Sequence, residues 1–134
     1  MQYGLIRTAA VAPQMRVADP DFNAASATDA VRTAAEEGAQ LVVLPRLFLT
    51  GSTCGSLYRT RSLTDKAEQA LADFVRATAE LDCITVVGLP VAYRGRVLDC
   101  AAAVCRGEIV GLTCACSPQE PFSEGVEGDR KSVV

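Results

Sequence analysis

The run QLVVLP, residues 40–45, sets narrow limits on the fold of this chain. It is an unbroken apolar segment ended by a proline, and such runs are typical of strands that are buried on both faces of a sheet. A second run of this kind, CITVVGLP, occupies residues 83–90. Parallel strands need a crossover connection, which is usually a helix. We therefore expect a helix between these two strands in the chain.

Two helices are predicted. The first follows a strand expected over Tyr3–Ala12 and begins at Asp19, a suitable N-cap, with Pro20 at its first position. Ser62 and Asp65 form a capping-box-like pair before the second helix. The apolar face of the first helix is Ala27, Ala30, Val31, Ala34, Ala35 and Gly38, and that of the second is Ala67, Ala70, Leu71, Phe74, Val75 and Thr78. Small residues at helical spacing let the first helix lie close to a sheet.

The pattern changes after the second apolar run. Arg94-Gly95 and Arg106-Gly107 separate short apolar segments, which favours antiparallel hairpin strands. The order strand, helix, strand, helix, strand and meander predicts an α/β fold. Its mixed sheet is expected to carry both helices on one face and to end in antiparallel hairpin strands.

Residues 3–112 are predicted to form this domain, because apolar periodicity ends at Leu112. Residues 113–134 are polar and are predicted to be a disordered or artefactual tail. The last segment, DRKSVV, matches the translation of a widely used sequencing-library adapter, so we expect read-through from Asp129 onward. The alternative is an ordinary disordered tail, and the nucleotide sequence distinguishes the two.

Composition excludes several classes of function. The chain has 134 residues, 49% of them hydrophobic, which is enough for one domain with a substantial core. Its net charge of −3 comes without a basic cluster, so neither nucleic acid nor an anionic membrane is expected as a partner. Neither a signal peptide nor a membrane-spanning segment is evident in the sequence, which favours a cytoplasmic protein.

The six cysteines do not indicate a disulfide framework. Cys83 and Cys100 lie in or beside strand-like runs, where a free cysteine behaves as a small hydrophobe. Cys114 and Cys116 are separated by one residue, and a metal or redox role for them is the less favoured reading. The sequence contains no histidine, which excludes Ser-His-Asp and Cys-His catalysis and His-ligated zinc.

Five segments carry a resemblance to a known family: YGLIRTAAVAPQMRVADPDFN, EEGAQLVVLP, LTGSTCGSLY, VVGLPV and GRVLDCAAAVCRGEIVGL. Together they resemble the N-terminal glutaminase domain of glutamine-dependent NAD synthetases, a branch of the nitrilase (carbon-nitrogen hydrolase) superfamily. The resemblance implies part of an α-β-β-α sandwich, glutamine as substrate and a homo-oligomeric family. ATP and Mg belong to a separate synthetase domain of the family, so no cofactor is expected for this chain.

By the same resemblance, the family hydrolyses the glutamine amide with a Glu-Lys-Cys triad. The ammonia is used for ATP-dependent amidation of nicotinic acid adenine dinucleotide. The family's glutamate follows the proline that ends the second strand, where this chain has Arg46. Arginine cannot act as a general base, because it is charged at working pH and has no acceptor.

The other triad positions are not matched either. The family's lysine follows the last hairpin strand, where this chain reads TCACSPQEP, and neither Lys66 nor Lys131 can be assigned its role. The nucleophilic cysteine belongs to a later strand, beyond the segments that show the resemblance. Ser52 stands where the family has a tyrosine of the glutamine pocket, and Ser56 replaces its aspartate.

Four hypotheses follow. The leading one is an inactive fragment of a glutamine-dependent NAD synthetase. The alternative is a catalytically dead, nitrilase-like interaction module in which Arg46 pairs with a carboxylate. An unrelated α/β redox or binding domain would use Cys114 and Cys116, which zinc titration tests. Another amidase of the superfamily is disfavoured by the TCG motif at residues 53–55.

Overall fold

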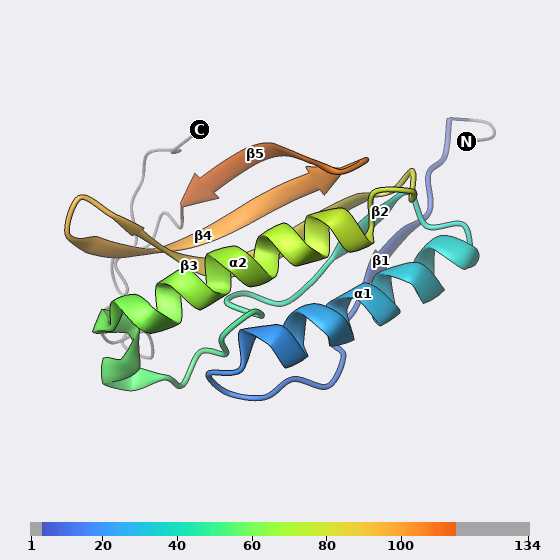
Figure 1. Cartoon of the computed structure of the whole chain (residues 1–134). Coiled ribbons are helices and arrows are strands. Elements are labelled where there is room, and N and C mark those ends of the chain that lie inside the picture. Colours follow the sequence, from blue (N-terminus) through green and yellow to red (C-terminus); the bar gives the residue numbers. More distant parts are fainter. Residues whose placement is uncertain (1–3, 115–134) are drawn as a thin grey trace.

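Five strands form one mixed sheet in the computed structural model, which describes residues 4–114. Their order across the sheet is their order in the chain: β1 (Thr8–Ala10), β2 (Leu41–Val43), β3 (Ile84–Tyr93), β4 (Arg96–Cys105) and β5 (Glu108–Cys114). β1, β2 and β3 are parallel, whereas β3, β4 and β5 are antiparallel (Figure 1). The predicted α/β fold with a mixed sheet is confirmed.

Two helices, α1 (Pro20–Glu36) and α2 (Arg61–Ala77), cover one face of this sheet (Figure 1). A short 3-10 helix, η1 (Gly55–Arg59), leads into α2. The core lies between the helices and the sheet, where Val31, Phe74, Val42 and Val87 are fully buried. Alanines on α1 and α2 keep this layer thin, as the small-residue pattern predicts. The apolar face predicted for α2 is buried throughout, whereas Gly38, predicted for the α1 face, is exposed.

One predicted helix start is right and the other is wrong. Asp19 caps α1 by accepting a hydrogen bond of 3.2 Å from the Phe22 N–H, and Pro20 is its first residue. The capping-box prediction for the second helix fails, because α2 starts at Arg61 and its N-cap is Thr60. The Thr60 hydroxyl accepts from the Leu63 N–H at 3.4 Å, so Ser62 already lies inside the first turn.

The prediction that the second strand is buried on both faces is also wrong. Val42 is fully buried against the helices, but its neighbour Val43 is 39% exposed, and Ile84 on β3 is 42% exposed. Within residues 4–114, the helices cover only one face, so burial alternates along β2. The other face of the sheet, which we call the open face, is apolar and partly exposed.

Strand lengths differ from those predicted at both ends of the domain. The first strand has three residues instead of spanning 3–12, because β1 pairs only with the three residues of β2. The last strand continues to Cys114, two residues past the predicted boundary at Leu112. It does so because Cys100 and Ala101 of β4 still supply partners there. The rest of the predicted tail, and Tyr3, lie outside the described residues.

Both predicted Arg-Gly turns are two-residue hairpins. Arg94 and Gly95 have φ of 51° and 77°, and Arg106 and Gly107 have φ of 50° and 81°. Positive φ at both central residues is the type I′ geometry that matches the twist of antiparallel strands. The hairpins therefore fix the register of β3, β4 and β5.

Candidate functional site

The loop that follows β2 carries the arginine singled out in the sequence. After Pro45 the chain turns back on itself: Leu47 has a positive φ of 52°, and the Gly51 N–H donates to its carbonyl at 2.7 Å. The Leu49 N–H donates to the Gly88 carbonyl at 3.2 Å, which ties the loop to β3. Arg46 is thereby held at the carboxyl end of β2, facing the sheet.

Gly88 is the residue that lets this loop lie against the sheet. A Cβ at residue 88 would be 2.5 Å from the Leu47 nitrogen and 2.9 Å from the Pro45 carbonyl oxygen. Such distances are too short for a carbon side chain. The position of Arg46 therefore depends on the absence of a side chain on the neighbouring strand.

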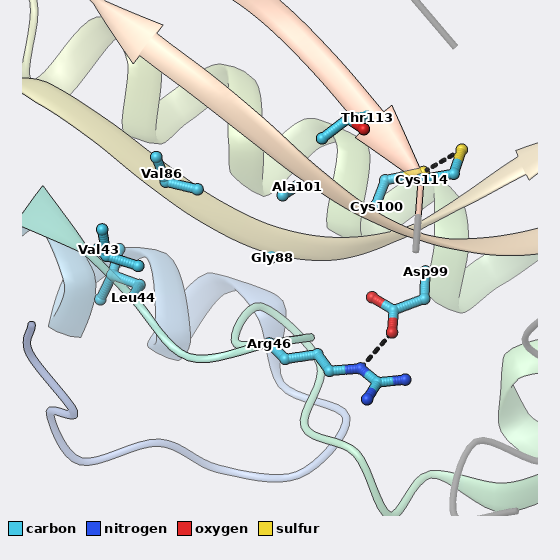
Figure 2. A pocket seen from close by; sticks show the side chains of 10 residues that line it. All are labelled: Val43, Leu44, Arg46, Val86, Gly88, Asp99, Cys100, Ala101, Thr113 and Cys114. Atoms are coloured by element: carbon cyan, nitrogen blue, oxygen red, sulfur yellow. Dashed lines mark hydrogen bonds and ion pairs between the residues drawn. The ribbon is translucent and has the colours of Figure 1, made fainter. Parts of the chain in front are cut away.

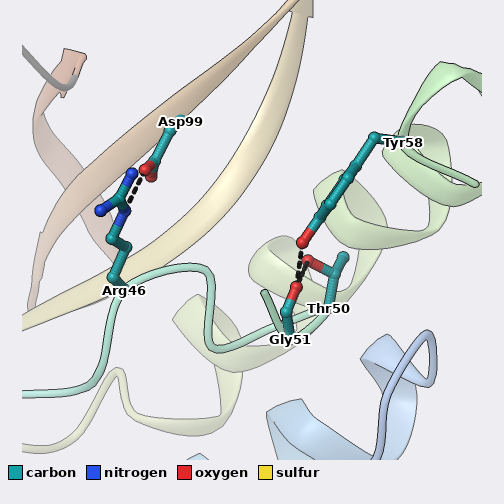
Figure 3. Close-up of polar contacts among 5 residues, drawn as sticks. All are labelled: Arg46, Thr50, Gly51, Tyr58 and Asp99. Atoms are coloured by element: carbon teal, nitrogen blue, oxygen red, sulfur yellow. Dashed lines mark hydrogen bonds and ion pairs between the residues drawn. The ribbon is translucent and has the colours of Figure 1, made fainter. Parts of the chain in front are cut away.

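Asp99 of β4 is the ion-pair partner of Arg46. The Arg46 Nε–H donates to a carboxylate oxygen of Asp99 (Figures 2 and 3). The Asp99 side chain is 6% exposed and that of Arg46 is 40% exposed. A carboxylate buried to this extent is costly unless it is paired, so Arg46 compensates the charge that β4 places there.

The pair lies beside a cavity of about 350 Å³ that opens on the open face of the sheet (Figure 2). The sheet register places Gly88 opposite Ala101 and Pro90 opposite Asp99, so these residues share that face. The cavity is lined by Val43, Leu44, Arg46, Val86, Gly88, Asp99, Cys100, Ala101, Thr113 and Cys114. Its walls are largely apolar, and Arg46 and Asp99 are the charged side chains among the lining residues.

This arrangement offers hydrogen-bond donors but no base at residue 46. An arginine donates hydrogen bonds and accepts none. The nearby carboxylate, that of Asp99, is already engaged in the ion pair with Arg46. A general base needs a free lone pair within reach of the proton that it removes. At residue 46 the described site therefore binds a charge but cannot take up a proton.

A second polar cluster fixes the remainder of the loop. The Tyr58 hydroxyl donates to the Gly51 carbonyl (Figure 3), and the Cys54 thiol donates to the Thr50 carbonyl at 3.1 Å. Tyr58 is fully buried. Burial, and then the neighbouring Cys54, raise the pKa of the Tyr58 hydroxyl well above its ordinary value. The segment LTGSTCGSLY is thus held by its own buried side chains.

The serines and lysines singled out in the sequence do not line the cavity in the described part of the chain. Ser52 is half-buried and Ser56 is exposed, and neither lines it. Lys66 is exposed on α2, and Lys131 lies outside the described residues. Cys116 also lies outside them, so the Cys114 and Cys116 pairing stays a prediction.

Sequence reasoning missed two features of the site. Asp99 interrupts the apolar alternation of RVLDCAAAV, which is a detectable signal for a buried charge in need of a partner. Cys100 and Cys114 face each other across β4 and β5, with their sulfurs 3.4 Å apart. Cys83 and Cys100 are buried, as expected of small hydrophobes, and so are Cys54 and Cys114.

Metal-binding clusters and membrane-spanning helices are both absent from residues 4–114. In that part of the chain, His, Cys, Asp and Glu side chains form no group of three or more that could hold a metal ion. None of the helices described there is long and apolar enough to cross a bilayer.

Comparisons with known proteins match most of the chain. The family profile described as carbon-nitrogen hydrolase matches residues 7–111. The glutamine-dependent NAD(+) synthetase of Mycobacterium tuberculosis is 37% identical over 111 residues, covering 83% of this chain and 16% of that protein. The chain therefore spans about a sixth of the length of this curated relative.

Solved structures give the same fold. A glutamine-dependent NAD(+) synthetase from Cytophaga hutchinsonii has a TM-score of 0.76 at 23% identity, with 82% of this chain and 19% of that chain covered. An amidase from Nesterenkonia sp. AN1, with acrylamide added at its active-site cysteine, has a TM-score of 0.77 at 22% identity. There the match covers 96% of this chain and 51% of the amidase.

Proposed function

Because this chain belongs to the carbon-nitrogen hydrolase family, we propose that it is the N-terminal part of a glutaminase domain of the NAD synthetase type in which the catalytic base is replaced. The observation that carries the proposal is the Arg46–Asp99 ion pair beside the cavity. The ancestral substrate is glutamine, and ATP and Mg are used by the separate synthetase domain of the family. The chain as it stands does not hydrolyse glutamine.

Residue 46 is the first position that makes the chain inactive. In the family that the sequence resembles, a glutamate follows the proline that ends the second strand, and here that position is Arg46. Arg46 stays charged at neutral pH, so a cysteine thiol next to it would not be deprotonated by this side chain. We assign no residue of this chain to the family's lysine or nucleophilic cysteine.

A chimeric enzyme tests the replacement directly. In the chimera, residues 7–111 of this chain replace the matching segment of the Mycobacterium tuberculosis synthetase. The synthetase supplies the remainder of the glutaminase domain. Ammonia release from glutamine is measured. NAD synthesis from added ammonia reports that the separate synthetase domain is intact, and circular dichroism compared with the parent enzyme reports that the exchanged domain is folded. We expect no glutaminase activity with Arg46, and glutaminase activity from a folded chimera with Arg46 would refute the proposal.

Restoring the base calls for a change at Asp99 as well. Arg46→Glu would place two carboxylates at one site, where like charges disfavour the ionised form of one of them. The double variant Arg46→Glu/Asp99→Asn removes that repulsion with little change in shape. We therefore expect glutaminase activity in the order double variant, then Arg46→Glu, then the unchanged chimera. The isolated chain carrying Arg46→Glu should remain inactive.

A second candidate function is a non-catalytic interaction module, and two observations favour it. Arg46 is paired with a carboxylate, as that hypothesis requires, and the open face presents Val43 and Ile84 to solvent. Apolar surface of this kind is buried in a stable complex. Sedimentation of the purified chain tests this: a monomer that stays soluble at all concentrations would count against it.

A further inference from the structure

Cys100 and Cys114 form a buried thiol pair between the last two strands. Cys100 is 2% exposed and Cys114 is 4% exposed, and the two sulfurs are 3.4 Å apart (Figure 2). They are direct partners in the antiparallel register. Neither thiol has a role in the function proposed above.

A β-bulge brings the two cysteines together. Near the turn, Val104 faces Ile109, whereas beyond it Ala103 faces Gly111, so Val110 is an extra residue in β5. A bulge of this kind shifts every later residue of the strand by one position. Without it, Thr113 would face Cys100, and the Cys114 side chain would point to the opposite face of the sheet. The alignment of the thiols therefore depends on a specific irregularity.

The backbone at this position suits a disulfide. Directly opposed residues in antiparallel strands have Cα atoms about 4.5 or 5.5 Å apart, depending on the hydrogen-bonding of the pair. Both distances lie within the range of about 4.4–6.8 Å found for disulfide-bonded cysteines. The sulfurs need to approach from 3.4 Å to about 2.05 Å, which is a small side-chain movement.

We propose that Cys100 and Cys114 are a redox site, at which a small-molecule disulfide converts the thiol pair into a cross-strand disulfide that fastens β5 to β4. In the first step the thiolate of one cysteine attacks a sulfur of the small disulfide, forms a mixed disulfide and releases one small thiolate. In the second step the other cysteine loses its proton to solvent and attacks the protein sulfur of the mixed disulfide. The second small thiolate leaves. The protein pair is oxidised by two electrons, and the small disulfide is reduced to two thiols.

The surroundings make this reaction slow and selective. Burial and the adjacent Cys114 raise the pKa of the Cys100 thiol, so Cys100 is disfavoured as the first attacking thiolate. We therefore assign the first attack to Cys114, near the end of β5. β5 is paired on one side only in the described sheet, so its end opens more readily than the strands between. Cys54 and Cys83 are also buried, but their sulfurs contact oxygen atoms, those of the Thr50 carbonyl and the Thr85 hydroxyl.

Oxidised glutathione serves as the probe, acting on the full 134-residue chain. Peptide mapping by mass spectrometry should show Cys100 joined to Cys114, and the number of titratable thiols should fall by two and recover with dithiothreitol. Cys105→Ser and Cys116→Ser should leave this product unchanged. Cys100→Ser and Cys114→Ser should each abolish it, and circular dichroism shows whether these variants are folded.

Three results would overturn the proposal. The first is a folded chain in which Cys100 and Cys114 remain free after the other accessible thiols have reacted. The second is a glutathione adduct on Cys114 that Cys100 does not displace. The third is a disulfide from Cys114 to Cys116 in place of the cross-strand bond.

Discussion

Removing the Arg46 charge should destabilise the fold more than removing an exposed charge does. Arg46→Met keeps the apolar stem of the side chain but removes the guanidinium that pairs with the Asp99 carboxylate, which is 6% exposed. Breaking a fully buried ion pair costs about 3–5 kcal/mol, and exposed pairs contribute about 0.2–1 kcal/mol. Because Arg46 is 40% exposed, we expect a loss of about 2 kcal/mol in the free energy of unfolding.

A double-mutant cycle isolates the pair from the other contacts of both residues. The variants are Arg46→Met, Asp99→Asn and the double substitution, and the coupling free energy should be about 1 kcal/mol or more. The matched control is the Asp73–Arg76 pair on α2, whose side chains are 60% and 71% exposed. Its coupling should be about 0.5 kcal/mol or less.

Urea unfolding followed by far-UV circular dichroism gives these free energies, and it suits a chain that has no tryptophan. Equal slopes of the unfolding transitions are needed for the comparison. The reasoning fails if the coupling at residues 46 and 99 is no larger than that of the exposed control pair. It also fails if Arg46→Met leaves the free energy of unfolding unchanged.

Three further predictions concern other parts of the fold. Burial raises the pKa of Tyr58, so above pH 10.0 the unfolded chain loses this proton while the folded chain keeps it. The free energy of unfolding should therefore fall as pH rises above this value. In urea unfolding experiments, the free energy of unfolding of Tyr58→Phe should fall less over the same pH range. Gly88→Ala would force the Arg46 loop off β3, so we expect the free energy of unfolding to fall by about 2–3 kcal/mol. The control is Gly111→Ala, where a Cβ would have open space around it, and this change should cost far less. Formation of the Cys100–Cys114 disulfide closes a loop of about 15 residues and should stabilise the chain by at most about 3 kcal/mol, seen as a higher urea midpoint that dithiothreitol reverses.

Local patterns predicted most of the fold. The Asp19-Pro20 start of α1, the apolar face of α2 and both Arg-Gly hairpins are confirmed, because each depends on residues close together in the chain. The prediction that β2 is buried on both faces was wrong, because an unbroken apolar run does not show whether a second layer covers the sheet. The predicted start of α2 was wrong because Ser62 and Thr60 are both suitable N-cap residues. The helix begins after Thr60 because η1 ends at Arg59, directly before it.

The candidate site was only partly predictable. Arg46 was found from its place after a strand, but its partner Asp99 lies 53 residues further along and on another strand. The thiol pair could not be deduced from the two-residue turn alone, because the bulge at Ala103/Val104 changes the register. Long-range partners and irregular registers follow from packing, which a single sequence does not display.

The topology of the sheet also bears on how the chain folds. β3, β4 and β5 are joined by two-residue turns, so their contacts close short loops, whereas β1 and β2 reach their partners only after a helix has been crossed. Short loops cost less entropy to close, so the meander is expected to be structured in the folding transition state. The Arg46–Asp99 contact joins the two parts, so we expect it to form late. Breaking it should therefore accelerate unfolding and leave the folding rate almost unchanged.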